Sequence, residues 1–112
     1  MMWMLMAAAQ VNLTENQFSS LPDVFGQLTT LLEVNLMENQ LSSLPESFGH
    51  LVALQTAYLG SNKISSLPET FGQLRALRHV DFTDNQLSSL PESFRQLIAV
   101  EIRLELNPLS SL

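Results

Sequence analysis

Leu41-Ser-Ser-Leu-Pro-Glu-Ser-Phe48 returns unchanged as Leu87-Ser-Ser-Leu-Pro-Glu-Ser-Phe94, and this stretch decides the fold. The half that precedes it also returns, as Val34-Asn-Leu-Met-Glu-Asn-Gln-Leu41 and Val80-Asp-Phe-Thr-Asp-Asn-Gln-Leu87. Asparagines lie at 16, 39, 62, 85 and 107, prolines at 22, 45, 68 and 91, and phenylalanines at 25, 48, 71 and 94. The intervals are 23 residues, except for a last asparagine interval of 22. A fixed period of this length indicates a repeat protein.

The period divides the chain into units at 8–30, 31–53, 54–76 and 77–98, followed by a partial unit at 99–112. The interval between Phe94 and Asn107 is one residue shorter than in the other units. Leu5 and Met2 fall where leucines and phenylalanines stand in later units, so residues 1–7 are predicted to be a degenerate half-repeat. We interpret residues 1–112 as a single domain.

Each unit contains two patterns. A stretch such as Val34-Asn35-Leu36 alternates at period two, which predicts a strand with one buried face. The apolar residues that follow do not alternate, and Pro45 fixes φ and lacks a donor, which favours an irregular or short helical return path. We expect residues 10–14, 33–37, 56–60, 79–83 and 101–105 to form one parallel sheet, with Phe25, Phe48, Phe71 and Phe94 stacked inside the opposite wall.

The asparagine column predicts a hydrogen-bond ladder. Where the chain leaves each strand, backbone N–H and C=O groups turn inward and need partners. An amide side chain offers both a donor and an acceptor, so one asparagine can satisfy neighbouring turns.

These motifs, LxxLxLxxNxL followed by xxLPxxFxxL, resemble the leucine-rich-repeat family over nearly the whole chain. Within it they resemble the intracellular subclass with LPxxF on the convex half, which includes Ras-group-related plant repeats, animal scaffold proteins that contact small GTPases, and several bacterial repeat proteins. The resemblance implies an α/β solenoid: a horseshoe fragment with one parallel β-sheet on the concave face and irregular or short helical convex segments. It also implies a non-enzymatic protein-binding module, and it offers a small GTPase or its regulator as one partner.

The composition limits the classes of partner that the chain can bind. The formal charge is −6, from eleven acidic and five basic residues, and such a surface repels phosphate, so we expect no nucleic-acid and no membrane partner. There are no cysteines, which excludes disulfides and thiolate sites. The apolar stretch 1–9 has no basic segment before it, as a secretory signal would. We expect a cytoplasmic protein, with a secreted bacterial effector as the alternative.

The sequence predicts no catalytic residue, no cofactor and no metal. The repeated Ser-Ser pairs lie in turns, outside any Gly-x-Ser-x-Gly motif. His79, Asp81 and Glu101 share one predicted face, but metal ligation needs three or four converging groups. We favour lateral pairs instead, of His79 with Glu101 and of Asp81 with Arg103.

The open face of the sheet is the predicted binding surface, because its residues vary between units while the core positions repeat. Tyr58 and Met37 are anchor-type residues, and Gly60 beside them is expected to leave space for a partner. The predicted partner-binding residues are Glu33, Asn35, Met37, Thr56, Tyr58, His79, Asp81, Glu101 and Arg103. The acidic surroundings predict a protein partner with a basic or amphipathic segment.

Two other functions stay open. The chain is alternatively a structural spacer within a longer repeat array, or a bacterial effector or surface repeat protein that acts on a host protein. Because solenoids need polar caps and both chain ends are apolar, we also expect either end-to-end self-association or a frayed first unit.

Overall fold

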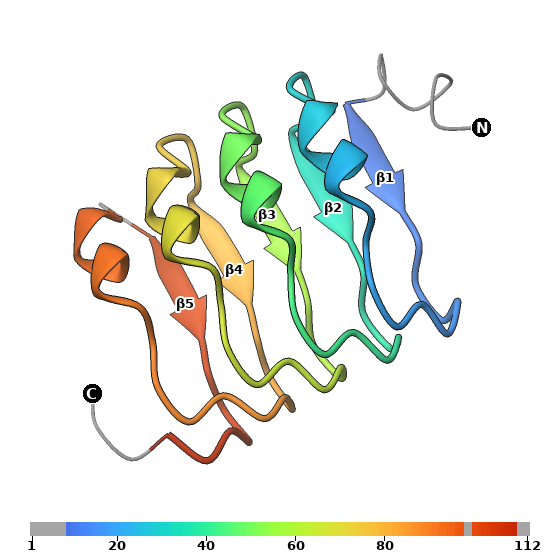
Figure 1. Cartoon of the computed structure of the whole chain (residues 1–112), viewed down its shortest axis with the longest axis vertical. Helices are drawn as coiled ribbons and strands as arrows, with labels where there is room; N and C mark the ends of the chain where they lie inside the picture. The colour runs from blue at the N-terminus through green and yellow to red at the C-terminus, as the bar shows by residue number, and fades with distance from the viewer. Residues whose placement is uncertain (1–8, 98–99, 110–112) are drawn as a thin grey trace.

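The computed structural model describes residues 9–97 and 100–109, which form a solenoid with strands along one side and short helices along the other (Figure 1). Its strands form one parallel sheet in the order β1-β2-β3-β4-β5. They are β1 (Gln10–Asn12), β2 (Glu33–Asn35), β3 (Thr56–Tyr58), β4 (His79–Asp81) and β5 (Glu101–Arg103). The predicted fold class is therefore confirmed.

Short 3₁₀ helices occupy the convex side, one after each LP motif. They are η1 (Asp23–Gln27), η2 (Glu46–His50), η3 (Glu69–Gln73) and η4 (Glu92–Gln96). Each begins directly after a proline in an extended conformation, such as Pro45 with φ −68°. Proline suits this position because its missing N–H would have no partner inside the helix.

The strands are shorter than the five residues that the alternation predicts. Each regular strand ends after three residues, although parallel hydrogen bonds continue beyond it: Leu36 N–H donates to the Tyr58 carbonyl at 2.8 Å. The chain then turns at Glu38, whose φ is 59°, and the residue before each ladder asparagine has the same left-handed backbone. This turn bends the chain out of the sheet, which the period-two pattern alone does not reveal.

The left-handed turn gives a stability prediction. A residue with a Cβ is strained at Glu38, so we expect Glu38→Gly to raise the free energy of unfolding by about 0.5–1 kcal/mol after the greater entropy of glycine in the unfolded chain is subtracted. Urea unfolding measures this value. Glu46→Gly is the control: Glu46 opens η2 and its φ is not positive, so glycine there should destabilise the protein. A loss of stability in both variants would contradict the prediction.

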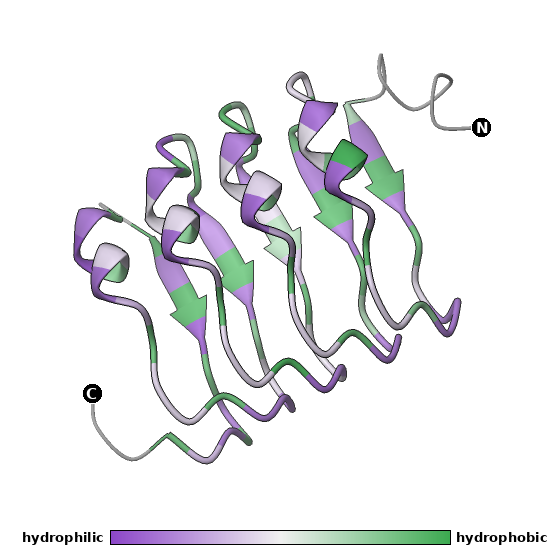
Figure 2. Ribbon diagram, viewed as in Figure 1, coloured by the Kyte–Doolittle hydropathy of each residue, from purple (hydrophilic) through white to green (hydrophobic). Residues whose placement is uncertain are grey.

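The core lies between the sheet and the convex helices. The central residue of β1 to β4 is buried between two more exposed neighbours, and Figure 2 shows these central residues as an apolar band that crosses the strands. On the convex side the phenylalanine rings stack as predicted. The distance between neighbouring ring centroids is 6.1 Å for Phe25 and Phe48, 5.9 Å for Phe48 and Phe71, and 5.4 Å for Phe71 and Phe94. The continuous core thus passes from unit to unit.

Burial declines in the last unit. Phe94, Ile102 and Leu104 are only half-buried, although the equivalent residues of the central units are buried. Leu106 is 75% exposed, because it occupies the left-handed turn position that is exposed or half-buried in every unit. The expected apolar surface is thus present at this end. The predicted half-repeat 1–7 lies outside the described residues, and end-to-end self-association stays a prediction.

Candidate functional site

The parallel register places the predicted binding residues in rows across the open face of the sheet, the face that points away from the helices. Glu33, Thr56, His79 and Glu101 form one row, and Asn35, Tyr58, Asp81 and Arg103 form the next. Met37 follows β2 two positions after Asn35. Seven of these nine residues are half-buried, and the other two, Glu101 and Arg103, are exposed. One face therefore carries all nine predicted residues.

Met37 fills the space that Gly60 was expected to leave for a partner, so that expectation is wrong. Gly60 is buried, and a Cβ built there would lie 3.2 Å from the Met37 methyl carbon and 3.2 Å from the Thr83 carbonyl oxygen. A flexible thioether reaches across to the neighbouring unit and packs on the bare glycine backbone. The Met37 methyl group therefore occupies the space above Gly60.

Tyr58, His79 and Glu101 form a contiguous row of side chains across three strands. The Tyr58 and His79 rings are 6.1 Å apart between centroids and tilted by 58°, a common aromatic arrangement. On its other side, His79 Nδ1 lies 3.3 Å from Glu101 Oε1, which confirms the predicted lateral pair. His79 is thus held between a ring and a carboxylate, and Tyr58 is braced in the middle of the face.

The predicted pair of Asp81 with Arg103 is wrong, although the two residues are register partners. Asp81 Oδ1 instead accepts a hydrogen bond from the Thr83 backbone N–H at 2.8 Å, and Arg103 Nη2 lies 3.7 Å from Glu105 Oε2. A short carboxylate readily bonds the backbone two residues ahead, which holds it away from the next strand. Arg103 then meets the acidic residue two positions later, in the turn that follows β5.

The same local bond recurs in other units and was missed from the sequence. Asn12 Oδ1 accepts from the Thr14 N–H at 3.1 Å, and Asn35 Oδ1 accepts from the Met37 N–H at 3.0 Å. The available signal was the Asn or Asp at the last strand position in three of the five units. Asn35 and Asp81 therefore shape the strand exit as well as line the open face.

Acidic groups dominate the open face. Glu33, Asp81, Glu101 and Glu105 lie on it or at its strand ends, against the single cation Arg103 among these rows. The adjoining turns add Glu15, Glu38 and Asp84. Because this surface is half-exposed or exposed, its negative potential extends into solvent and is screened by salt.

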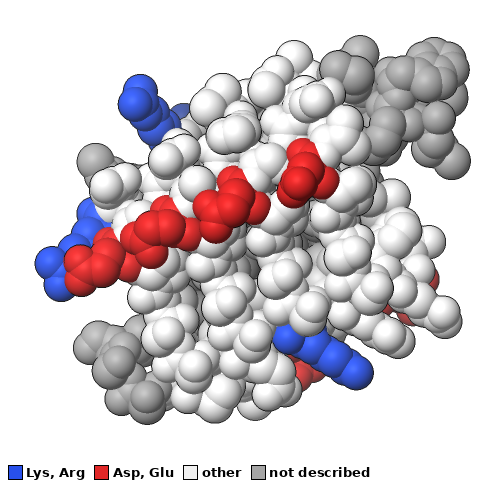
Figure 3. All heavy atoms as spheres, viewed as in Figure 1, with Lys and Arg blue, Asp and Glu red and all other residues white. Residues whose placement is uncertain are grey.

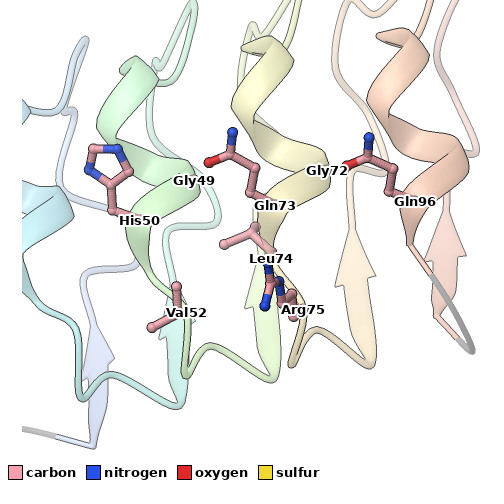
Figure 4. Close-up of a pocket in the computed structure, with 8 residues that line it drawn as sticks. All are labelled: Gly49, His50, Val52, Gly72, Gln73, Leu74, Arg75 and Gln96. Atoms are coloured by element: carbon pink, nitrogen blue, oxygen red, sulfur yellow. The ribbon is translucent and has the colours of Figure 1, made fainter.

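The convex side carries a second acidic feature. Asp23, Glu46, Glu69 and Glu92 open the four helices, all are exposed, and Figure 3 shows them as a continuous row across this side. Beside the row lies a shallow hollow along η2, η3 and η4, into which His50, Gln73 and Gln96 project from equivalent helix ends (Figure 4). The hollow is shallow and open to solvent, unlike the enclosed pockets of small-molecule sites.

Neither side assembles a metal site in the part of the chain that the structure describes: no group of three or more His, Asp or Glu side chains there is arranged to hold an ion. Within the same residues, no helix is long and apolar enough to cross a membrane.

Comparison with known proteins gives the family. A leucine-rich-repeat model matches residues 9–64, and a second leucine-rich-repeat model matches residues 76–97. A solved leucine-rich-repeat protein of Leptospira interrogans is 35% identical, with a TM-score of 0.83 over 86% of this chain. The match covers 25% of that protein, so this chain spans about a quarter of its length. No curated protein gives a significant match.

The chain therefore belongs to the leucine-rich-repeat family. Members of this family generally mediate protein–protein interactions, and they are typically non-enzymatic. Because 171 solved chains match this fold significantly, the fold by itself leaves the partner undefined.

Proposed function

We propose that this chain is a non-enzymatic module that binds a protein partner on the concave, open face of its sheet. The observation that carries the proposal is the position of Tyr58 and Met37. Both are half-buried on the open face, at the centre of a surface that is otherwise polar and acidic. An aromatic ring and a thioether in such a setting are typical interface anchors.

The partner segment is basic or amphipathic. Glu33, Asp81 and Glu101 surround the apolar centre, so a segment with Lys or Arg beside an apolar residue complements both its charge and its packing. Five strands at about 4.8 Å spacing span about 20 Å, enough for one helix or one extended segment. This area is below a standard interface of about 800 Å² per partner, so binding is modest.

An intracellular setting belongs to this proposal, and a small GTPase or its regulator is one partner that the family resemblance supports. Similarity to a Leptospira interrogans protein favours the bacterial alternative, in which the same face binds a host protein. The spacer alternative predicts that the open face binds nothing. Affinity capture with the purified chain, followed by mass spectrometry, distinguishes these alternatives, because each predicts a different captured protein or none.

Once the partner is known, Tyr58→Ala should weaken binding by about 1–3 kcal/mol, because it removes a central anchor. Its effect on the free energy of unfolding should be smaller than about 1 kcal/mol, since Tyr58 lies outside the buried core. Isothermal titration calorimetry at two salt concentrations measures the affinity, which should fall as salt rises.

Glu69→Lys is the matched control, since Glu69 is an exposed residue of η3 on the convex side. It reverses a charge without touching the open face, so affinity should hardly change. Loss of binding in Glu69→Lys with full binding in Tyr58→Ala would place the working surface on the convex side and reject the proposal.

A further inference from the structure

The residue after each convex phenylalanine changes character in the last helix. Gly26, Gly49 and Gly72 occupy this position in η1, η2 and η3, whereas Arg95 occupies it in η4. All three glycines are buried, while Arg95 is exposed. The change replaces the smallest side chain with one of the largest, at a position that faces along the solenoid.

The glycines are required by the stacking of one helix on the next. A Cβ at Gly26 would lie 2.3 Å from the Ser47 carbonyl oxygen, one at Gly49 would lie 2.4 Å from that of Thr70, and one at Gly72 would lie 2.2 Å from that of Ser93. Real Cβ atoms essentially never come closer than 3.0 Å to such atoms. The obstacle in each case is the backbone of the following unit, which has no rotamer to move away.

Hydrogen bonds between adjacent helices also hold the helices at this short distance from one another. Ser47 Oγ donates to the Asp23 carbonyl at 2.7 Å, and Thr70 Oγ1 donates to the Glu46 carbonyl at 2.6 Å. Moving two helices apart to admit a Cβ would break this bond and separate the stacked phenylalanine rings. The contact between units therefore accepts glycine and rejects larger residues.

The chain leaves η4 differently as well. At the residue after the helix, ψ is 58° at Leu28, 67° at Leu51 and 81° at Leu74, but 121° at Leu97. The interval from Asn85 to Asn107 is 22 residues rather than 23. Both features alter the convex path in the unit that carries Arg95.

We propose that Arg95 ends the row of convex helices: the outer face of η4 rejects a further LPxxF helix stacked in register, whether that helix follows in a longer chain or belongs to a second copy. The sheet side has no equivalent obstacle. The Phe82 carbonyl accepts hydrogen bonds from the side-chain amides of Asn85 and Asn107, whereas among the described residues the Leu104 carbonyl accepts one side-chain amide bond, from Asn107.

An extended chain tests the proposal directly. Leu109-Ser-Ser-Leu112 repeats Leu87-Ser-Ser-Leu90, so a copy of residues 91–112 appended after Leu112 continues the period without a linker. We expect the backbone amides of the appended 3₁₀ segment to exchange at least tenfold more slowly when the original Arg95 is replaced by glycine than when it is kept. Arg78→Gly in the same extended chain is the control, because Arg78 is exposed and lies outside the helix row. Equal protection with Arg95 and with Arg95→Gly overturns the proposal.

A pair of alanine substitutions tests the same geometry in the chain without the appended residues. Gly72→Ala and Arg95→Ala place the same methyl group at equivalent positions of η3 and η4. We expect Gly72→Ala to lower the urea midpoint clearly and Arg95→Ala to leave it nearly unchanged. If Gly72→Ala is tolerated as well as Arg95→Ala, the helices can move apart and Arg95 is no obstacle.

Discussion

Phe71→Ala is expected to lower the free energy of unfolding by about 3–5 kcal/mol, the usual cost of truncating a buried phenylalanine. Phe71 is fully buried, and its ring contacts three others: Phe48 at 5.9 Å, Phe82 at 5.5 Å and Phe94 at 5.4 Å between centroids. Truncation leaves a cavity between two units, where the clasped helices and the paired strands prevent collapse. The loss therefore falls at the high end of core truncations.

Urea unfolding followed by circular dichroism measures this loss. Phe94→Ala is the graded comparison and should cost less, because Phe94 is only half-buried at the end of the same stack. Val52→Ala, at a side chain that is 55% exposed, should be nearly neutral. Equal losses at Phe71 and Phe94 would show that the convex stack does not carry the stability of the central units.

Asn62→Ala should cost about 2–4 kcal/mol, because it leaves several buried backbone groups without partners. Asn62 Oδ1 accepts the Leu41 N–H at 3.0 Å, and Nδ2 donates to the carbonyls of Leu36 at 2.9 Å and Leu59 at 3.0 Å. One amide thus satisfies groups from two units. Its removal loosens the contact between them as well as the turn itself.

Asn16→Ala is the matched control, since Asn16 has the same position in the first unit but is exposed, and its Nδ2 donates to the Thr14 carbonyl alone among the described residues. Thermal unfolding of the two variants should separate them by more than about 1.5 kcal/mol. Similar midpoints for both would mean that solvent replaces the amide in the interior, and the asparagine ladder would then contribute little.

The binding surface shows where sequence reasoning was sufficient. Alternation and period place Tyr58 beside Asp81 and His79 beside Glu101, because parallel strands in register bring equivalent positions together. The lateral pair of His79 with Glu101 follows from register alone, since both side chains are long enough to meet across one strand spacing. Whether these residues bind a partner stays a prediction.

The sequence did not predict which neighbours the side chains of Asp81, Arg103 and Met37 contact. Register also places Asp81 beside Arg103, yet each finds a nearer partner within its own unit. Met37 covers Gly60 because a flexible side chain packs on whatever apolar surface is nearest in space. These outcomes depend on competing side-chain contacts whose free energies differ by about 1 kcal/mol or less. A sequence pattern does not show which of these contacts is the more stable.

The sequence by itself determined the solenoid, the strand register, the phenylalanine stack and the asparagine ladder. Each repeats every unit, and a unit that cannot bury its own apolar side must stack in register on its neighbours. Only the tertiary structure decided why Gly26, Gly49 and Gly72 are glycine. The reason is the short distance between the backbones of adjacent helices. The hydrogen bonds between helices and the stacked phenylalanine rings together set this distance, so it is defined only after the units have packed.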